Sequence, residues 1–378
     1  MKLLVNPHRK KTVDTYDSVL VEKRIEQSEH FHKCLPGYLP TPCVNPASLA
    51  MKLDLQLLLV KDESKRFGLK AFKGLGASFA IYNYLKILSG GYLAPDDFLT
   101  KGPEIAKDVV FTTATDGNHG RAVAWTAKLL KRPAIIYMPA GSVESRISAI
   151  KSEGAEVIVV DGSYDEAVRR ASSDAAKYGR IVIADTGYEG YLDIPSYIQQ
   201  GYLTLFAELR EQINRMKAPA PDFVFIQSGV GAFAAAAAEF FSVFYPDARL
   251  VSVEPLSADC LRRSAAEPDG RAVTVSGGGT IMAGLNCGTP SLTAWDAIKD
   301  SFYAFLAIED LWAEKAMRLF SENGIVSGES GCAGLAALLA LKNEYQEFFK
   351  DNTKKNKPVV LLISTEGDTD PVFYNKIV

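Results

Sequence analysis

The stretch that decides the fold is 223-FVFIQSGVGAFAAAAAEF-240, in which an apolar run leads through two glycines into an alanine-rich segment. The first part predicts a buried strand and the last part a helix. Between them, Gly229 to Ala234 fits the pattern G-x-G-x-x-A. Glycines let the backbone approach a ligand, and the N-terminus of a helix binds phosphate. Glu254 ends the next apolar run at about the spacing of a ribose-binding acid, so a nicotinamide or flavin dehydrogenase is one interpretation. The motif alone does not separate it from another phosphate-bearing cofactor.

Short apolar runs alternate with helical patterns along the rest of the chain. Besides residues 223–228, we expect strands at residues 55–60, 108–113, 134–139, 157–162, 181–186, 249–255 and 358–365. Helical patterns such as residues 120–131 and 142–154 fall between most of them. Near-continuous apolar strands separated by helices predict parallel sheets covered on both faces. The strands are too many for one ordinary sheet, so we expect an α/β chain with two doubly wound, three-layer α/β/α domains.

Composition limits the class of protein. The chain has 378 residues, 47% of them hydrophobic, and a formal net charge of -3. This charge gives no electrostatic footprint for nucleic acid or an anionic membrane, so we expect neither as a partner. The first residues, MKLLVNPHRKK, have too short an apolar run for a signal peptide, and Glu239 interrupts the apolar stretch 231–244. These features predict a soluble, cytoplasmic protein.

Histidine and cysteine do not form a recognisable metal motif. We expect 30-HFH-32 to lie on an exposed helix face, and the chain to hold no metal. The five cysteines include no CxxC pair. Cys260 and Cys287 lie in segments that could meet in space. We expect them to be thiols, with a bond between them as the alternative that a thiol titration would decide.

Two further strand ends carry polar groups. The loop 114-ATDGNHGRA-122 can present amides to a carboxylate and places Asp116, Asn118 and His119 at the mouth of a site, although a polar turn that caps a helix is the simpler interpretation. After the last strand comes 365-TEGDTD-370, whose hydroxyl could bond a ring nitrogen or only the backbone.

Lys73 is unusual because it stands in an apolar, glycine-rich stretch, 68-GLKAFKGLGASFA-80. Burying an ammonium is costly, so Lys73 either reaches solvent or contributes its amine to a site. Together with the strand-end loops, it places phosphate-, carboxylate- and ring-binding groups on one chain.

This combination resembles the fold-type-II, tryptophan-synthase-like pyridoxal-phosphate enzymes, and among them most closely the diaminopropionate ammonia-lyases. The resemblance covers nearly the whole chain and is carried, in the expected order, by residues 66–73, 113–120, 185–191, 229–232, 280–285, 327–331 and 364–370. It implies a homodimer with pyridoxal 5'-phosphate as cofactor and a small amino acid as substrate. It also implies a larger domain, residues 1–77 with 200–378, and a smaller one, residues 78–199.

The resemblance implies roles at the cofactor. Lys73 would form the Schiff base with the cofactor aldehyde, and a desolvated amine that loses proton affinity would suit this role. Asn118 would bond the phenolic oxygen, and Thr365 would face the pyridine nitrogen and leave it largely unprotonated. The remaining cofactor-binding residues would be Phe72, Gly229, Val230, Gly231, Ala232 and Phe233.

The same resemblance implies roles at the substrate. Thr115 and the amides around it would hold the substrate carboxylate. Asp116 stands where serine and threonine dehydratases have a small residue, and it could attract a second ammonium on the β-carbon. We hypothesise that Lys73 deprotonates L-diaminopropionate and Asp116 the D-isomer. Asp185 and Glu189 are candidates for guiding the β-amino group, with Asp185 also a catalytic candidate.

The predicted reaction is α,β-elimination of 2,3-diaminopropionate to pyruvate and two ammonia molecules. A serine or threonine dehydratase is the alternative that keeps the cofactor. A dehydrogenase would leave Lys73 and two strand-end loops without roles, and a silent binding protein would leave the intact lysine and acids unexplained.

Overall fold

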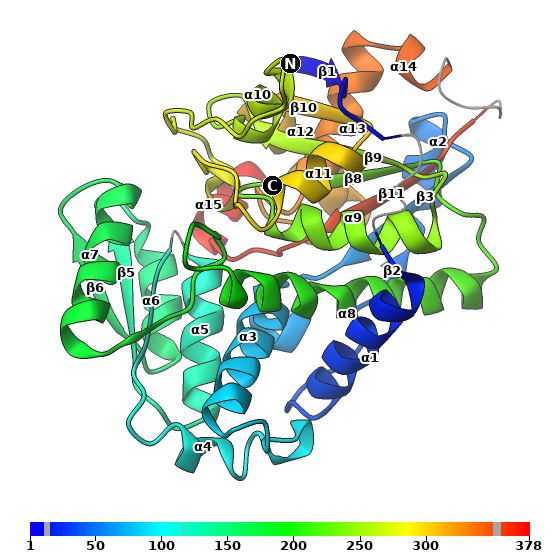
Figure 1. Ribbon diagram of the computed structural model, residues 1–378. Helices are drawn as coiled ribbons and strands as arrows, with labels where there is room; N and C mark the ends of the chain where they lie inside the picture. The colour runs from blue at the N-terminus through cyan, green and yellow to red at the C-terminus, as the bar shows by residue number, and fades with distance from the viewer. Residues whose placement is uncertain (11–15, 116, 351–356) are drawn as a thin grey trace.

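The computed structural model describes residues 1–10, 16–115, 117–350 and 357–378, and its strands form two sheets (Figure 1). The larger sheet has the order β1-β10-β9-β8-β11-β3-β2 and the smaller one β6-β5-β4-β7. The strands of the larger sheet are β1 (Lys2–Val5), β2 (Cys43–Val44), β3 (Leu57–Asp62), β8 (Phe223–Gln227), β9 (Arg249–Pro255), β10 (Ala304–Ile308) and β11 (Val359–Ser364). The strands of the smaller sheet are β4 (Phe111–Ala114), β5 (Ala134–Pro139), β6 (Glu156–Val160) and β7 (Ile181–Val182). In the described parts of the chain, only the edge strands β1 and β2 pair antiparallel.

Helices separate most of these strands. They are α1 (Ser18–Lys33), α2 (Ala47–Lys52), α3 (Lys73–Leu88), α4 (Gly102–Ile105), α5 (Asn118–Leu129), α6 (Glu144–Ser152), α7 (Tyr164–Tyr178), α8 (Asp193–Met216), α9 (Ala232–Phe244), α10 (Cys260–Ala266), α11 (Trp295–Ser301), α12 (Asp310–Glu322), α13 (Ala333–Glu344), α14 (Glu347–Lys350) and α15 (Pro371–Ile377). Short 3-10 turns are η1 (Arg66–Gly68), η2 (Pro95–Asp97) and η3 (Ala283–Leu285). None of the helices described is both long and apolar enough to cross a lipid bilayer.

Both faces of the larger sheet are apolar. Successive side chains along each strand point to opposite faces, and each face packs against a hydrophobic core of its own. On β8, Phe223 and Phe225 pack with residues of α12 and α13, whereas Val224 and Ile226 pack with residues of α8 and α9. The smaller sheet follows the same rule, with α5 over one face and α7 over the other. The expected α/β architecture with parallel, doubly covered sheets is therefore confirmed.

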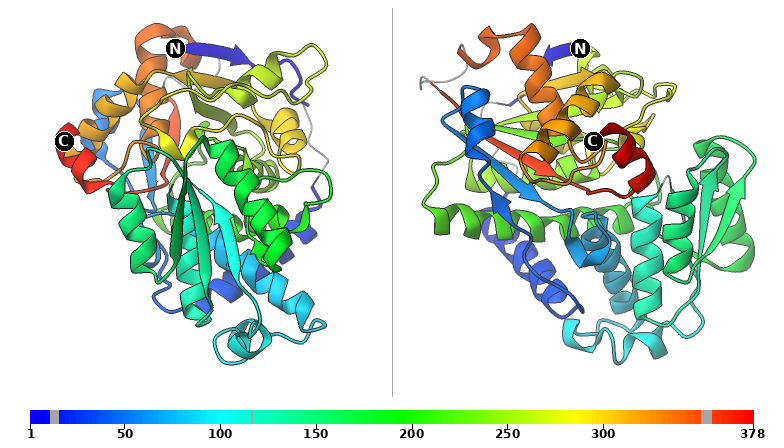
Figure 2. Two further views of the ribbon diagram at one scale, coloured as in Figure 1. Left: turned by 90° about the vertical axis from the view of Figure 1, so that its left-hand side faces the viewer. Right: turned by 180° about the vertical axis from the view of Figure 1, so that it is seen from behind.

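The two sheets share one continuous core. It runs from the larger sheet through α8 and α3 to α5 and the smaller sheet, and Figures 1 and 2 show α8 lying between the larger sheet and the helices α1 and α3. The domain boundaries expected at 77/78 and 199/200 fall inside α3 and α8. The division of the chain into two domains stays a prediction.

Sequence patterns located most of the strands but missed three of those in the described residues. Strands β5 and β9 have the predicted bounds, and β7 ends four residues earlier than predicted. The patterns missed β1, β2 and β10. The first two are short antiparallel edge strands, which need no continuous apolar run because one side of each strand is unpaired.

Candidate active site

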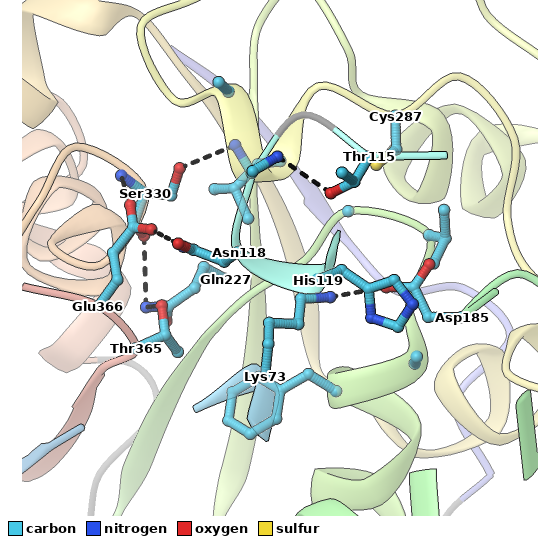
Figure 3. A pocket seen from close by; sticks show the side chains of 18 of the residues that line it. Lys73, Thr115, Asn118, His119, Asp185, Gln227, Cys287, Ser330, Thr365 and Glu366 are labelled. Atoms are coloured by element: carbon cyan, nitrogen blue, oxygen red, sulfur yellow. Dashed lines mark hydrogen bonds and ion pairs between the residues drawn. The ribbon is translucent and has the colours of Figure 1, made fainter. Parts of the chain in front are cut away.

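A cavity of about 100 Å³ lies where strand ends from both sheets meet (Figure 3). Its walls come from the segments after β3, β4, β8 and β11, which is where ligands gather in open α/β sheets. A second cavity of about 750 Å³ adjoins it, and the two share Asp185, Val230 and Cys287 among their lining residues. Together the two cavities provide a binding site for a small molecule and a route by which it can enter.

Lys73 is the first residue of α3, and its amine points into this cavity (Figure 3). Backbone hydrogen bonds connect the segment before Lys73 to the end of β11. The Phe72 amide donates to the Thr365 carbonyl at 3.1 Å, and the Gly367 amide donates to the Lys70 carbonyl at 2.9 Å. The lysine that the sequence singled out therefore reaches a site, and the last strand of the larger sheet supports its position.

Asp185 is the partner of Lys73. Lys73 Nζ donates to Asp185 Oδ2 at 2.6 Å. Burial acts to lower the pKa of Lys73, but the Asp185 carboxylate holds that pKa above its ordinary value. Burial likewise acts to raise the pKa of Asp185, but the Lys73 ammonium holds it below its ordinary value. The expectation that Lys73 loses proton affinity is wrong for this arrangement, because the nearby carboxylate outweighs desolvation.

The glycine loop after β8 forms the opposite wall. Gly231 has φ +100°, a left-handed conformation that favours glycine, and α9 begins at the next residue. A Cβ on Gly229 would come 2.8 Å from Cys287 Sγ. The first-turn N–H groups of a helix have no carbonyl partner within it, so this wall offers donors for an anion.

The loop after β4 brings Thr115 and Asn118 to the cavity. Thr115 Oγ1 accepts from the amides of Gly117 at 3.0 Å and Gly120 at 3.1 Å, so part of the expected carboxylate-binding amide set already caps α5. Asn118 Nδ2 donates to the Glu366 carboxylate. Asp116 lies outside the described residues.

Thr365 lies at the end of β11, beside Gln227 from the end of β8 (Figure 3). Gln227 Nε2 donates to Thr365 Oγ1 at 2.9 Å. Neither a carboxylate nor a cation is bonded to this hydroxyl in the described part of the chain. The Thr365 hydroxyl therefore has a neutral amide as its partner, whereas Lys73 has a carboxylate.

Several cavity residues were missed from the sequence. Gln227 ends the predicted strand, and Glu366 follows Thr365 in a motif that was singled out, yet neither was assigned a role. The Glu366 carboxylate also accepts from the Ser330 amide at 3.1 Å. Burial and then the Glu366 charge raise the pKa of Glu329 to about 7, while an ion pair with Arg146 opposes the rise. Arg146 comes from α6, so this pair joins the two sheets beside the cavity.

His119 was placed at the mouth of the site by the sequence, and it does line the cavity. Its Nε2 lies 2.7 Å from the Ile183 carbonyl, which makes Nε2 the protonated nitrogen, and burial lowers the pKa of the ring. A neutral imidazole therefore stands next to the charged pair.

Two acids do not reach the cavity. Glu189 is exposed at the tip of a turn closed by Tyr188 and Tyr191, and it lines neither cavity, so the structure does not support its expected place at the substrate. Glu254 accepts from the amides of Leu261 at 2.7 Å and Arg262 at 2.8 Å and is fully buried. Because Glu254 caps α10, it is not available to a ribose, which removes the basis of the dehydrogenase interpretation.

For the cysteines the expected thiol state is confirmed, and for the histidines the expected exposure is wrong at one residue. Cys260 and Cys287 are both thiols, as expected. The expectation for residues 30–32 is wrong, because His32 is fully buried between Thr204 Oγ1 at 2.7 Å and the Leu75 carbonyl at 2.9 Å. His30 is exposed and lies near Cys34 and Asp96.

The donor set fits pyridoxal phosphate. An amine, an amide-rich glycine loop at a helix N-terminus and a hydroxyl line one cavity, as an aldehyde, a phosphate and a ring nitrogen require. Gln227 Oε1 is buried without a hydrogen-bond partner among the described residues, which is expected for a cavity wall that meets a ligand.

Comparison with known proteins gives the class of protein. A family model described as pyridoxal-phosphate dependent enzyme matches residues 34–364, so the chain belongs to that family and its cofactor is pyridoxal phosphate. Within this class it is 42% identical to diaminopropionate ammonia-lyase from Salmonella typhimurium over 368 residues, which covers 92% of this chain and 90% of that one.

Solved structures agree with this placement. The crystal structure of diaminopropionate ammonia-lyase from Escherichia coli in complex with an aminoacrylate-PLP azomethine reaction intermediate matches with a TM-score of 0.90 and 36% identity, covering 100% of this chain and 96% of that one. Threonine deaminase from Solanum lycopersicum matches with a TM-score of 0.73 at 21% identity, over 100% of this chain and 96% of that one, which shows the shared fold.

Proposed function

We propose that the protein is a pyridoxal-phosphate-dependent ammonia-lyase that converts 2,3-diaminopropionate and water to pyruvate and two ammonia molecules. The observation that carries this proposal is the Lys73–Asp185 pair, 2.6 Å apart in a cavity that also holds the glycine loop and Thr365. Asp185 gives the site a carboxylate for a substrate with a second ammonium. The similarity to lyases of that substrate supports the same conclusion.

The cofactor would be held at three places. Asn118 would bond the phenolic oxygen, with Phe72 also at the cofactor, and Thr365 would bond the ring nitrogen. The loop of Gly229, Val230, Gly231, Ala232 and Phe233 would hold the phosphate. When bound, the cofactor supplies a conjugated ring that accepts the electrons released from Cα. The chain's own residues must supply binding, orientation and proton transfer.

Asp185 would control the charge of Lys73. Whenever Lys73 is not bonded to the cofactor, the Asp185 carboxylate would stabilise its ammonium form, and an ammonium is no base. When the β-ammonium of the substrate pairs with Asp185, the carboxylate no longer stabilises a charge on Lys73. The pKa of Lys73 then falls, because burial is no longer opposed, and Nζ can accept the proton from Cα. Substrate binding thus activates the base.

Asp116 would serve the D-isomer. Its flanking residues Thr115 and Gly117 line the cavity. We assign Cα deprotonation of the L-isomer to Lys73 and of the D-isomer to Asp116, on the strength of the sequence resemblance. Asp116→Asn should therefore reduce turnover of the D-isomer far more than that of the L-isomer, and equal loss of both would contradict the division.

The substrate carboxylate would bind at the loop after β4. Thr115 keeps its hydroxyl hydrogen, because Oγ1 only accepts from the two amides that cap α5. We further propose a cytoplasmic homodimer, a larger domain of residues 1–77 and 200–378, and a smaller domain of residues 78–199 that closes on the substrate.

A serine or threonine dehydratase is the second candidate, because the same fold carries threonine deaminases. The experiment that separates the two measures pyruvate and ammonia from D- and L-diaminopropionate, L-serine and L-threonine. Two ammonia per pyruvate from diaminopropionate, with slow turnover of serine, would support the lyase. Turnover of serine or threonine alone would overturn it and keep the cofactor chemistry. A yellow colour bleached by borohydride reports lysine-bound cofactor independently of substrate.

A further inference from the structure

Gln227 is fixed in one orientation by the strand ends around it. Its Nε2 lies 2.7 Å from the Ile363 carbonyl, 2.9 Å from the Gly331 carbonyl and 3.4 Å from the Ser330 carbonyl. Carbonyl oxygens only accept hydrogen bonds, so the side-chain nitrogen must face them. Turning the amide over would place its oxygen against three other oxygens in a buried setting, since the residue is 3% exposed.

This orientation decides what the Thr365 hydroxyl can do. The same Nε2 lies 2.9 Å from Thr365 Oγ1. An amide nitrogen has no lone pair to offer, so the hydroxyl can accept from Gln227 but cannot donate to it. In the described part of the chain Thr365 Oγ1 donates to no other group. Its hydrogen is left for whatever occupies the cavity.

We propose that Gln227 is a positioning residue that keeps the Thr365 hydroxyl as a donor toward the ring nitrogen of the cofactor, so that this nitrogen stays unprotonated. The proposal rests on the cofactor placement given above. A nitrogen that accepts a hydrogen bond carries no proton of its own, and the ring then withdraws electrons less strongly than a pyridinium would.

The acid nearest in sequence to Thr365 does not compete for this role. Glu366 accepts from Asn118 Nδ2 through one oxygen and from the Ser330 amide through the other. Both oxygens are engaged by donors, so this carboxylate is directed toward the loop after β4. Thr365, held by Gln227, is the group that meets the ring nitrogen.

Removing Gln227 should release the hydroxyl. In Gln227→Met the side chain keeps its length and loses both donors, which removes the hydrogen bonds that the carbonyls of Ile363 and Gly331 accept from it. An unpaired buried acceptor is costly, so the Thr365 hydroxyl turns to donate to one of them. The ring nitrogen then loses its hydrogen bond.

The test is the ¹⁵N resonance of ring-labelled pyridoxal phosphate in the holoenzyme without substrate. We expect the unprotonated form in the parent protein. The resonance should shift in Gln227→Met to the position seen in Thr365→Val, and the double variant should show no additional shift, because the two residues act through one hydrogen bond. Thr365→Ser should keep the parent resonance.

Two further variants separate positioning from packing. Ser252→Ala removes a buried hydrogen bond of 2.9 Å to Ser228 near the same strand end and should leave the resonance unchanged. If Gln227→Met does not fold, Gln227→Leu removes the same donors with a smaller apolar side chain and should give the same shift.

A protonated nitrogen in the parent protein would overturn the proposal, and so would a Gln227→Met resonance equal to the parent's with only stability lost. The measurement needs no turnover. A holoenzyme that leaves diaminopropionate unchanged would defeat the proposed reaction while this result still stands.

Discussion

Two lysines twelve residues apart, each paired with a carboxylate, serve opposite purposes. Lys61 on β3 is fully buried, and its ammonium meets Glu208 Oε2 at 2.7 Å, the Thr41 carbonyl at 2.6 Å and Gln212 Oε1 at 3.2 Å. Lys73 is one-fifth exposed, has Asp185 as its ionic partner and faces a cavity. An ammonium has three hydrogens to donate. Lys61 has used all three within the protein, so it serves the fold, whereas Lys73 keeps capacity for a ligand.

The surroundings strengthen this contrast. Glu208 also pairs with Arg66, at 2.7 Å from Nη2, and Arg66 pairs with Glu63 at 2.8 Å. The Lys61 site is a closed network of alternating charges. Among the described residues Lys73 has one ionic partner, Asp185, and a charged substrate can rearrange this pair.

The largest expected effect is on catalysis. Lys73→Ala should lower kcat by about 10⁴-fold, because it removes both the cofactor's covalent partner and the base. The apoprotein should lose less stability than Lys61→Met does, since the pair is partly open to solvent. Steady-state kinetics and urea unfolding of the same preparation check both. A variant that retains parental kcat would end the assignment of Lys73.

Lys61→Met should give the reverse pattern. Breaking a buried ion pair by removing one partner costs about 3 kcal/mol or more of unfolding free energy. Arg66 remains to compensate Glu208, so the protein should fold and its folded fraction should keep kcat close to the parent's. Urea denaturation monitored by tryptophan fluorescence measures the loss. Lost kcat with unchanged stability would place Lys61 in the site and break the comparison.

Asp185→Asn should lower the pKa of Lys73. In the parent protein the Asp185 carboxylate raises the pKa of Lys73. The Lys73 ammonium therefore persists as pH rises and loses its proton only above the ordinary lysine range. Without the carboxylate, burial dominates and deprotonation should occur at least about one pH unit lower. Reductive methylation of the apoprotein with ¹³C-formaldehyde, followed by NMR titration, reads this directly. Lys61 is the internal control, because its fully buried amine should stay unmodified.

The smallest effects are expected at two tyrosines. Tyr38 Oη donates to Glu208 Oε1 at 2.9 Å beside the structural lysine, so Tyr38→Phe should cost about 1–2 kcal/mol of unfolding free energy. Tyr202, whose ring lies 6.0 Å from Lys73 Nζ, has a buried hydroxyl without a hydrogen-bond partner in the described residues. Tyr202→Phe should therefore be close to neutral in the same denaturation assay. Equal costs at the two positions would show that the Lys73 side is as fully bonded as the Lys61 side.

The sequence predicts the parts of this molecule that depend on short stretches. Strand β5 is apolar over its full length and β9 contains an apolar run, and both have the predicted bounds. Lys73, Asp185 and the glycine loop were found because each lies in a distinctive motif, and they do meet in one cavity. The two-residue strand β2 carries no such pattern and was missed.

Other errors concern the direction in which a side chain points, which a sequence motif does not encode. Glu189 is four residues from Asp185, yet the turn between them sends it to solvent. His30 and His32 are two residues apart on α1, where side chains lie about 200° apart, so the helical period itself argues against a shared exposed face. Gln227 and Thr365 are brought together only by the pairing of β8 with β11, which no local pattern specifies.

The pairing of β3 with β11 has a consequence for protein synthesis. Leu57 of β3 lies beside Val359 of β11, and the Phe72 amide depends on the Thr365 carbonyl. About 300 residues separate these partners, so a ribosome adding 5–20 residues per second needs roughly 15–60 s between them. Lys73 therefore cannot reach its working position on a nascent chain. The Lys73 amine is set in place only after the segment that contains Thr365 has been synthesised.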